Sequence, residues 1–161
     1  MENMLKDNIY RWLGISAIVL ALDLYTKHLI QSTFVYGEHL TITRFFDLVH
    51  FRNEGAAFGF LNDAGGWQKW FFTAISITAA VVITYLIKKH SKQKLFCLGL
   101  ALVLGGAIGN LYDRLTLGYV VDFLYFHINE YYWPAFNVAD SAICVGVAIL
   151  LWDSFKQDKN A

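Results

Sequence analysis

Four long apolar stretches alternate with shorter polar segments along the chain. Each approaches the length of about 20 residues that an α-helix needs to cross the hydrocarbon core of a bilayer. The second and third contain no charged residue, whereas Asp23 and Lys27 interrupt the first and Asp140 interrupts the fourth. The pattern therefore predicts an all-α membrane protein with four transmembrane helices, at about residues 12–30, 70–87, 95–112 and 136–152.

A different pattern fills the segment between the first two stretches, at about residues 34–61. The run from Thr41 to Phe51 is rich in β-branched and aromatic residues, which favour strands. Glycines at Gly37, Gly55 and Gly59 indicate turns around it. We therefore expect a small extracytoplasmic β-rich segment between the first and second helices, within a single transmembrane domain of residues 1–161.

Lysines and arginines predict the orientation of these helices. The loop from Lys88 to Lys94 contains four lysines, an excess that is typical of short cytoplasmic loops. With this loop inside, an even number of spans places both termini in the cytoplasm and residues 31–69 and 113–135 outside. The basic residues near the two ends of the chain then also lie inside: Lys6, Arg11, Lys156 and Lys159.

The composition agrees with a membrane protein and excludes several other classes. Of the 161 residues, 57% are hydrophobic and 16% are charged, whereas about a quarter of a soluble domain is charged. The formal net charge is zero, so nothing indicates a nucleic-acid partner. Cys97 and Cys144 lack the spacing of a zinc site or disulfide framework, and the histidines are scattered. We therefore expect neither a metal nor another cofactor.

Charged and amide side chains gather toward the outer ends of the predicted helices. A charge at the centre of a membrane costs about 3 kcal/mol or more, so such residues usually face a polar cavity and have a function. Because packed helices bring their outer ends together, we expect one shared polar pocket at the outer boundary. Its candidate residues are Asp23, Lys27, Asn110, Asp113, Arg114, Asp122, Asn137 and Asp140.

Asp122 and Asp140 are the candidates for chemistry in this pocket. Both lie among apolar residues, and neither has a lysine or arginine next to it in the sequence. Two carboxylates that are close together in a low dielectric cannot both ionise easily, so one acid and one base coexist near neutral pH. Such a pair can activate a water molecule and protonate a leaving amine. The pattern therefore favours hydrolysis, with Asp113, which adjoins Arg114, in a structural role.

Several of these residues also have structural interpretations. Asp140 lies where an acidic residue can cap the start of a helix. Asp23 and Lys27 are four residues apart and fit a structural ion pair on one helix face better than a catalytic pair. Arg114 can pair with Asp113 or with lipid headgroups.

Two other classes of protein stay open at this point. A small transporter or channel would also contain intramembrane charges, but the inner halves of the second, third and fourth stretches are almost purely apolar. A structural membrane protein would use a small-residue face such as Gly105–Gly109 for helix packing, although an enzyme would use it equally well.

Five sequence blocks resemble the lipoprotein signal peptidases of bacteria, the signal peptidase II family. Their order, their spacing and their placement relative to the four spans agree with that family, from the first helix to the fourth. The blocks are Asp23–Lys27, Asn53–Phe58, Gly105–Arg114, Val120–Phe123 and Phe136–Ser141.

The resemblance implies an aspartyl endopeptidase, a hydrolase of the bacterial inner (cytoplasmic) membrane with its active site at the periplasmic face. Its substrate is a prolipoprotein in which a diacylglyceryl-modified cysteine follows the cleaved bond, and globomycin-type cyclic peptides inhibit the family. Asp122 and Asp140 would be the catalytic pair. The positions that support the site or bind substrate would be Asn53, Asn110, Asp113, Arg114, Asn137, Asp23 and Lys27.

Overall fold

The computed structural model describes residues 2–55 and 67–158, and this part of the chain contains four helices and four strands. All four helices are long and apolar enough to cross a membrane, which confirms that part of the prediction. They are longer than predicted because polar residues at their ends continue the helix past the apolar stretches. The helices are α1 (Glu2–Thr33), α2 (Trp67–Lys89), α3 (Lys94–Thr116) and α4 (Val138–Asp158).

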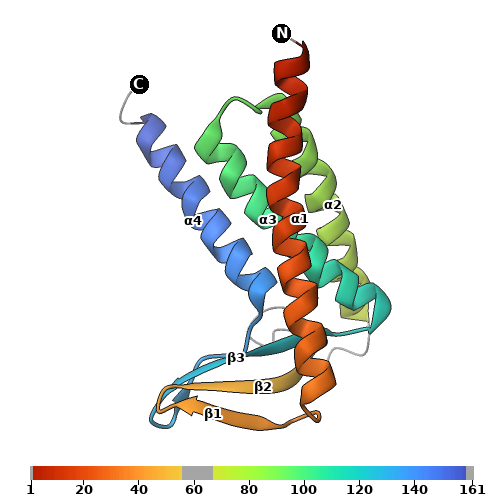
Figure 1. Cartoon of the computed structure of the whole chain (residues 1–161), viewed down its shortest axis with the longest axis vertical. Helices are drawn as coiled ribbons and strands as arrows, with labels where there is room; N and C mark the ends of the chain where they lie inside the picture. The colour runs from red at the N-terminus through yellow and green to blue at the C-terminus, as the bar shows by residue number, and fades with distance from the viewer. Residues whose placement is uncertain (1, 56–66, 159–161) are drawn as a thin grey trace.

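Helix α3 is the most buried of the four and packs against the other three (Figure 1). Glycines let its backbone approach its neighbours closely. A Cβ atom on Gly105 would lie 2.7 Å from the carbonyl oxygen of Ser16 in α1, and one on Gly106 would collide with the carbonyl oxygen of Ala139 in α4. Small residues at helix interfaces permit such contacts in membranes, where packing rather than the hydrophobic effect holds helices together. This close packing therefore fixes where the polar side chains of α1, α3 and α4 lie relative to one another.

A four-stranded antiparallel sheet lies at one end of the helices (Figure 1). Its strands, in the order in which they pair, are β1 (His39–Thr43), β2 (Phe46–Asn53), β3 (Val120–Ile128) and β4 (Tyr131–Tyr132). The predicted strand-like run of residues 41–51 is thus a hairpin that turns at Arg44 and Phe45.

Placing the β structure only between the first two helices was incomplete. Half of the strands come from the connection between α3 and α4, which the fold prediction did not include. The first four residues of β3, Val120–Phe123, are all buried, including Asp122, so burial in this part of the strand does not alternate from one residue to the next. The end of the predicted segment, residues 56–61, lies outside the described residues.

The turn from α3 into β3 depends on Gly118. Its φ of +90° lies in the left-handed region that glycine enters without steric cost. The backbone N–H groups of Leu117 and Gly118 both donate to the carbonyl of Asp113, at 2.7 and 3.2 Å, and so cap the end of α3. The chain then runs back along β2, where Phe51 pairs with Asp122. This turn brings Asp122 to the end of the helices at which the sheet lies.

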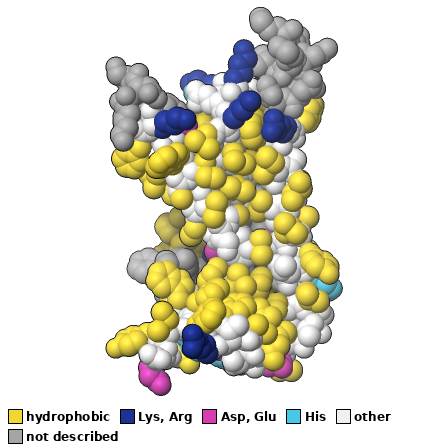
Figure 2. Space-filling view, turned by 60° about the vertical axis from the view of Figure 1, so that its left-hand side comes forward, with side chains coloured by type: hydrophobic (Ala, Val, Ile, Leu, Met, Phe, Trp, Pro, Cys, Tyr) yellow, Lys and Arg dark blue, Asp and Glu magenta, His cyan; other side chains and the backbone are white. Residues whose placement is uncertain are grey.

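Basic side chains and the sheet occupy opposite ends of the molecule. Both termini lie at the end away from the sheet (Figure 1), where most of the lysine and arginine side chains visible in Figure 2 gather. Between these ends the helices expose apolar side chains, such as Val81 on α2 and Leu151 on α4. Exposed apolar surface of this kind suits contact with lipid tails.

Candidate active site

Asp122 and Asp140 meet where the sheet joins the helices, and Asn137 connects them. The Asn137 side-chain amide donates to Asp122 Oδ1 at 2.8 Å. Its side-chain oxygen accepts the backbone N–H of Asp140 at 2.9 Å, and its own backbone N–H donates to Asp140 Oδ2 at 3.3 Å. Asn137 is fully buried, so these contacts are shielded from water. The two candidate carboxylates therefore share one rigid hydrogen-bond partner.

The reciprocal bonds between Asn137 and Asp140 form a capping box at the start of α4. A side chain at the cap position and an acidic residue three positions later satisfy each other's free backbone N–H groups. The structural interpretation of Asp140 is therefore correct. This role does not exclude the chemical one, because Asp140 also lines a cavity.

Two further asparagines hold the carboxylates from opposite sides. Asn110 of α3 donates to Asp140 Oδ1 at 2.8 Å. Asn53, at the end of β2, donates to Asp122 Oδ2 at 3.0 Å. Within the described part of the chain, each carboxylate thus accepts two hydrogen bonds, one from Asn137 and one from an asparagine of another element of the fold. Such bonds restrict both side chains to single rotamers.

A buried ion cluster lies next to the carboxylates and centres on Lys27. Its ammonium group lies 2.7 Å from Asp23 Oδ2 and 3.1 Å from Asp113 Oδ2, and it donates to Asn110 Oδ1 at 3.0 Å. The predicted pair of Asp23 and Lys27 is confirmed. Asp23 also accepts the backbone N–H of Ala139 at 2.8 Å, which ties α1 to the first turn of α4.

Arg114 does not form the ion pair with Asp113 that adjacency in the sequence suggested. Asp113 instead pairs with Lys27 and accepts the backbone N–H of Val121 at 3.1 Å. The guanidinium of Arg114 donates to the carbonyl oxygens of Asn110 and Gly55, at 3.3 and 2.9 Å. Neighbouring residues on a helix point to different faces, so this pair could not meet.

Asp122 has an unusual electrostatic environment. Its side chain is buried at the edge of the membrane-spanning region, in a strand rather than in a spanning helix. Burial penalises the charged form, and the nearby charge of Asp140 adds to this effect, which together raise the pKa of Asp122 to about 7. Hydrogen bonds from Asn53 and Asn137 oppose the shift but do not cancel it. Asp122 can therefore gain or lose a proton near neutral pH.

A cavity of about 270 Å³ opens beside Asp140. Its walls include Trp133, Phe136 and Cys144, which the sequence analysis did not place in the site. The aromatic cluster at the start of the fourth apolar stretch could have indicated Trp133 and Phe136, whereas no local pattern marks Cys144. The structure thus brings together every predicted site residue and adds an apolar wall next to one carboxylate.

Comparisons with known proteins identify the family. The chain matches the family model described as Signal peptidase (SPase) II over residues 15–156. Lipoprotein signal peptidases from Ralstonia nicotianae and Burkholderia mallei are 56% and 54% identical to it, over 91% and 93% of this chain and 84% and 90% of theirs. The chain belongs to the signal peptidase II family.

Solved structures agree with membership of the signal peptidase II family. A bacterial membrane enzyme solved by the in meso method at 2.3 Å resolution has a TM-score of 0.84 and 31% sequence identity, covering 93% of this chain and 90% of that chain. A second such enzyme, at 1.9 Å resolution, has a TM-score of 0.79 and 30% identity, over 91% and 93% of the two chains. Signal peptidase II proteins are proteases, so the chain is an enzyme rather than a transporter or a purely structural protein.

Proposed function

We propose that this protein is an aspartyl endopeptidase that removes the signal peptide from diacylglyceryl-modified prolipoproteins. Cleavage occurs on the N-terminal side of the lipid-modified cysteine. The observation that carries this proposal is the pair of Asp122 and Asp140, which share Asn137 as a hydrogen-bond partner at the junction of sheet and helices, while Asn53 and Asn110 each hold one of them. The names of the relatives, lipoprotein signal peptidases, support the choice of substrate class.

The pair holds one proton between two carboxyl groups when the enzyme is active. The ionised carboxylate accepts a proton from a water molecule, whose oxygen attacks the carbonyl carbon of the scissile peptide bond. The protonated carboxyl stabilises the resulting tetrahedral intermediate and supplies the proton that the departing amine needs. The pKa of Asp122, raised to about 7, allows one proton to stay in the pair near neutral pH.

The surrounding residues position this pair. Asn53, Asn110 and Asn137 fix the carboxylate orientations, which is the preorganisation that catalysis requires. The cluster of Lys27, Asp23 and Asp113 locks α1, α3 and the start of α4 together beneath the site. Arg114 lies beside Asn110, in a position to support the site or to bind the substrate.

The substrate implies a particular place in the cell. We place the protein in the bacterial inner membrane as a single multi-pass domain of residues 1–161, with both termini in the cytoplasm and the site at the periplasmic face. Basic residues at the end away from the site support this orientation, because cytoplasmic loops carry an excess of lysine and arginine. A lipid-anchored cysteine is held at the membrane surface, which is the depth at which the sheet meets the helices. The partners are then prolipoproteins and membrane lipid, and globomycin-type peptides would inhibit.

Cleavage of a defined precursor tests this proposal. Purified protein in detergent is given a precursor peptide with and without the diacylglyceryl group on its cysteine, and the products are identified by mass spectrometry. We expect cleavage of the modified peptide just before the cysteine and little cleavage of the unmodified one. Equal cleavage of both peptides, or cleavage at another bond, would contradict the proposed substrate class.

A further inference from the structure

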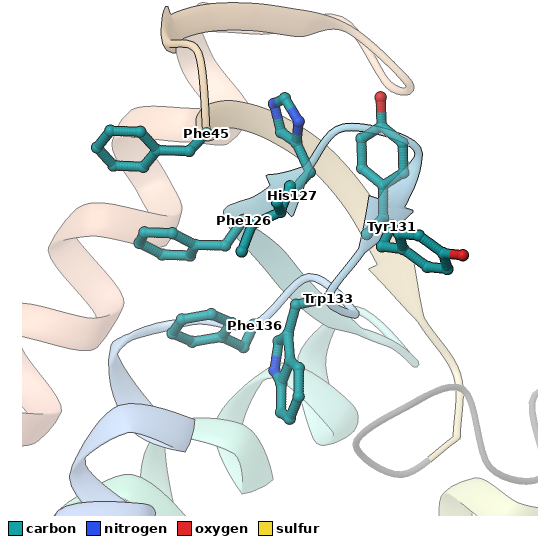
Figure 3. Close-up of a pocket in the computed structure, with 8 residues that line it drawn as sticks. Phe45, Phe126, His127, Tyr131, Trp133 and Phe136 are labelled. Atoms are coloured by element: carbon teal, nitrogen blue, oxygen red, sulfur yellow. The ribbon is translucent and has the colours of Figure 1, made fainter.

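A second and larger cavity, of about 650 Å³, lies on the sheet next to the candidate active site (Figure 3). Its size is within the range of ordinary ligand pockets. Of the eight described residues that line it, six are phenylalanine, tyrosine or tryptophan. In Figure 3 the rings of Phe45, Phe126 and Phe136 follow one another toward the start of α4, while Tyr131 comes from the hairpin between β3 and β4.

The two cavities share walls. Trp133 and Phe136 line both, and the smaller cavity also contains Asp140. One continuous apolar surface therefore leads from a candidate catalytic carboxylate out across the sheet. We call this surface the aromatic trough and define it by the residues that line the larger cavity, among them the shared pair Trp133 and Phe136.

The position of the trough limits what can occupy it. The described residues that line the larger cavity all lie outside the four membrane-spanning segments. In the proposed reaction the signal peptide lies in the membrane, and the acyl chains on the cysteine stay in the outer leaflet. The polypeptide that follows the cysteine must leave the site outward, which is the direction in which the trough runs.

The walls of the trough suit a short uncharged peptide. Among the residues that the structure describes, no lysine, arginine, aspartate or glutamate lines the larger cavity. His127 and the tyrosines offer polar groups that an acyl chain would not use. The walls are also preformed. The rings of Phe126 and Phe136 stack with centroids 5.8 Å apart, and those of His127 and Tyr132 with centroids 4.9 Å apart. A preformed surface binds a flexible chain without first having to be ordered.

We propose that the aromatic trough binds the first few residues of the mature lipoprotein, directly after the lipid-modified cysteine, as an extended uncharged segment. This inference rests on the proposed function. It makes the start of the mature chain part of what the enzyme recognises, in addition to the signal peptide and the lipid.

Two substrates with the same signal peptide and the same diacylglyceryl cysteine test the proposal. The short one ends at the cysteine as an amide, and the long one continues for four uncharged residues. We expect kcat/KM for the long substrate to exceed that for the short one by about tenfold, the gain that burial of one apolar side chain supplies. We expect the Tyr131→Ala, Ile128→Ala double variant to reduce this ratio toward one. These side chains are 84% and 74% exposed, so little packing is lost, and the melting temperature of the double variant checks that it folds.

The matched control is Tyr85→Ala, which removes an exposed tyrosine from α2, away from the trough. This variant should keep the wild-type ratio. A ratio near one in the wild type, or an unchanged ratio in the double variant, would overturn the proposal. Equal losses on both substrates would indicate that the trough binds lipid or maintains the fold, and would overturn it as well. Failure of the wild type to cleave either substrate would instead contradict the proposed function.

Discussion

The protonation of Asp122 links the stability of the protein to pH. Its pKa of about 7 in the folded state exceeds the value of about 3.9 for an aspartate in an unfolded chain. The folded protein therefore binds this proton more tightly, so the contribution of Asp122 to stability is complete below about pH 4 and is lost as the pH rises through about 7. We expect the melting temperature of the wild type to fall over this range relative to that of Asp122→Asn. Parallel curves for the two proteins, measured by thermal unfolding in detergent, would contradict this environment for Asp122.

Lys27 contributes more to the stability of the fold than either of its two acidic partners. Lys27→Met would leave Asp23 and Asp113 buried without a cation, at a cost of about 3–5 kcal/mol in the free energy of unfolding. Asp23→Asn keeps an oxygen that can accept the backbone N–H of Ala139 and leaves Lys27 paired with Asp113, so we expect a loss of only about 1 kcal/mol. Denaturation of both purified variants would measure the difference. Equal losses would mean that Lys27 does not bridge the two carboxylates.

At the level of single residues, local pairings were predictable and remote ones were not. The spacing of Asp23 and Lys27 indicated their ion pair, because residues four apart lie on one helix face. Of the two partners suggested for Arg114, Asp113 was wrong, because Asp113 pairs with Lys27 of a different helix, whose packing no local pattern reveals. The same reason explains why Asn110 was not predicted to contact Asp140 across the interface between α3 and α4.

At the level of elements, close packing of α3 and α4 positions the candidate catalytic pair. A side chain on Gly106 would collide with the backbone carbonyl of Ala139, one residue before Asp140. We expect Gly106→Ala to push the start of α4 away, to cost about 1–3 kcal/mol in stability and to reduce activity. Gly14→Ala is the matched control, because a Cβ atom at Gly14 meets nothing within 4 Å. Measurement of melting temperature and peptide cleavage for both variants tests this; a Gly106→Ala protein as stable and active as Gly14→Ala would contradict it.

The helices, which hydropathy defines, could be predicted from the sequence. The strands, which depend on pairing between distant segments, could be predicted only in part. Four apolar stretches were sufficient to indicate α1 to α4, since bilayer thickness sets a length that the sequence shows directly. The prediction of the sheet was incomplete because β2 pairs with β3, and two helices separate these strands in the sequence. The buried run of β3 also lacks the alternation that marks a half-exposed strand.

At the level of the whole molecule, the proposed orientation in the membrane can be tested. Single cysteines at Lys92 and Glu130, both exposed, can be introduced after Cys97 and Cys144 have been replaced. We expect a membrane-impermeant maleimide to label the Glu130→Cys protein in spheroplasts, and the Lys92→Cys protein only after the membrane has been opened. The reverse labelling would put the site on the wrong side for a prolipoprotein.

The central claim is that Asp122 and Asp140 together hydrolyse the peptide bond, and their amide variants test it most directly. Asparagine keeps the shape of each side chain but cannot exchange a proton. We expect Asp122→Asn and Asp140→Asn each to lower kcat on the lipid-modified precursor by about a thousandfold, and the double variant to be little worse than either, because the pair acts as a unit. Asp47→Asn, at a buried aspartate of the sheet outside the site, should remain active. A near wild-type rate in either single variant, with the protein folded, would remove that aspartate from the reaction and contradict the account.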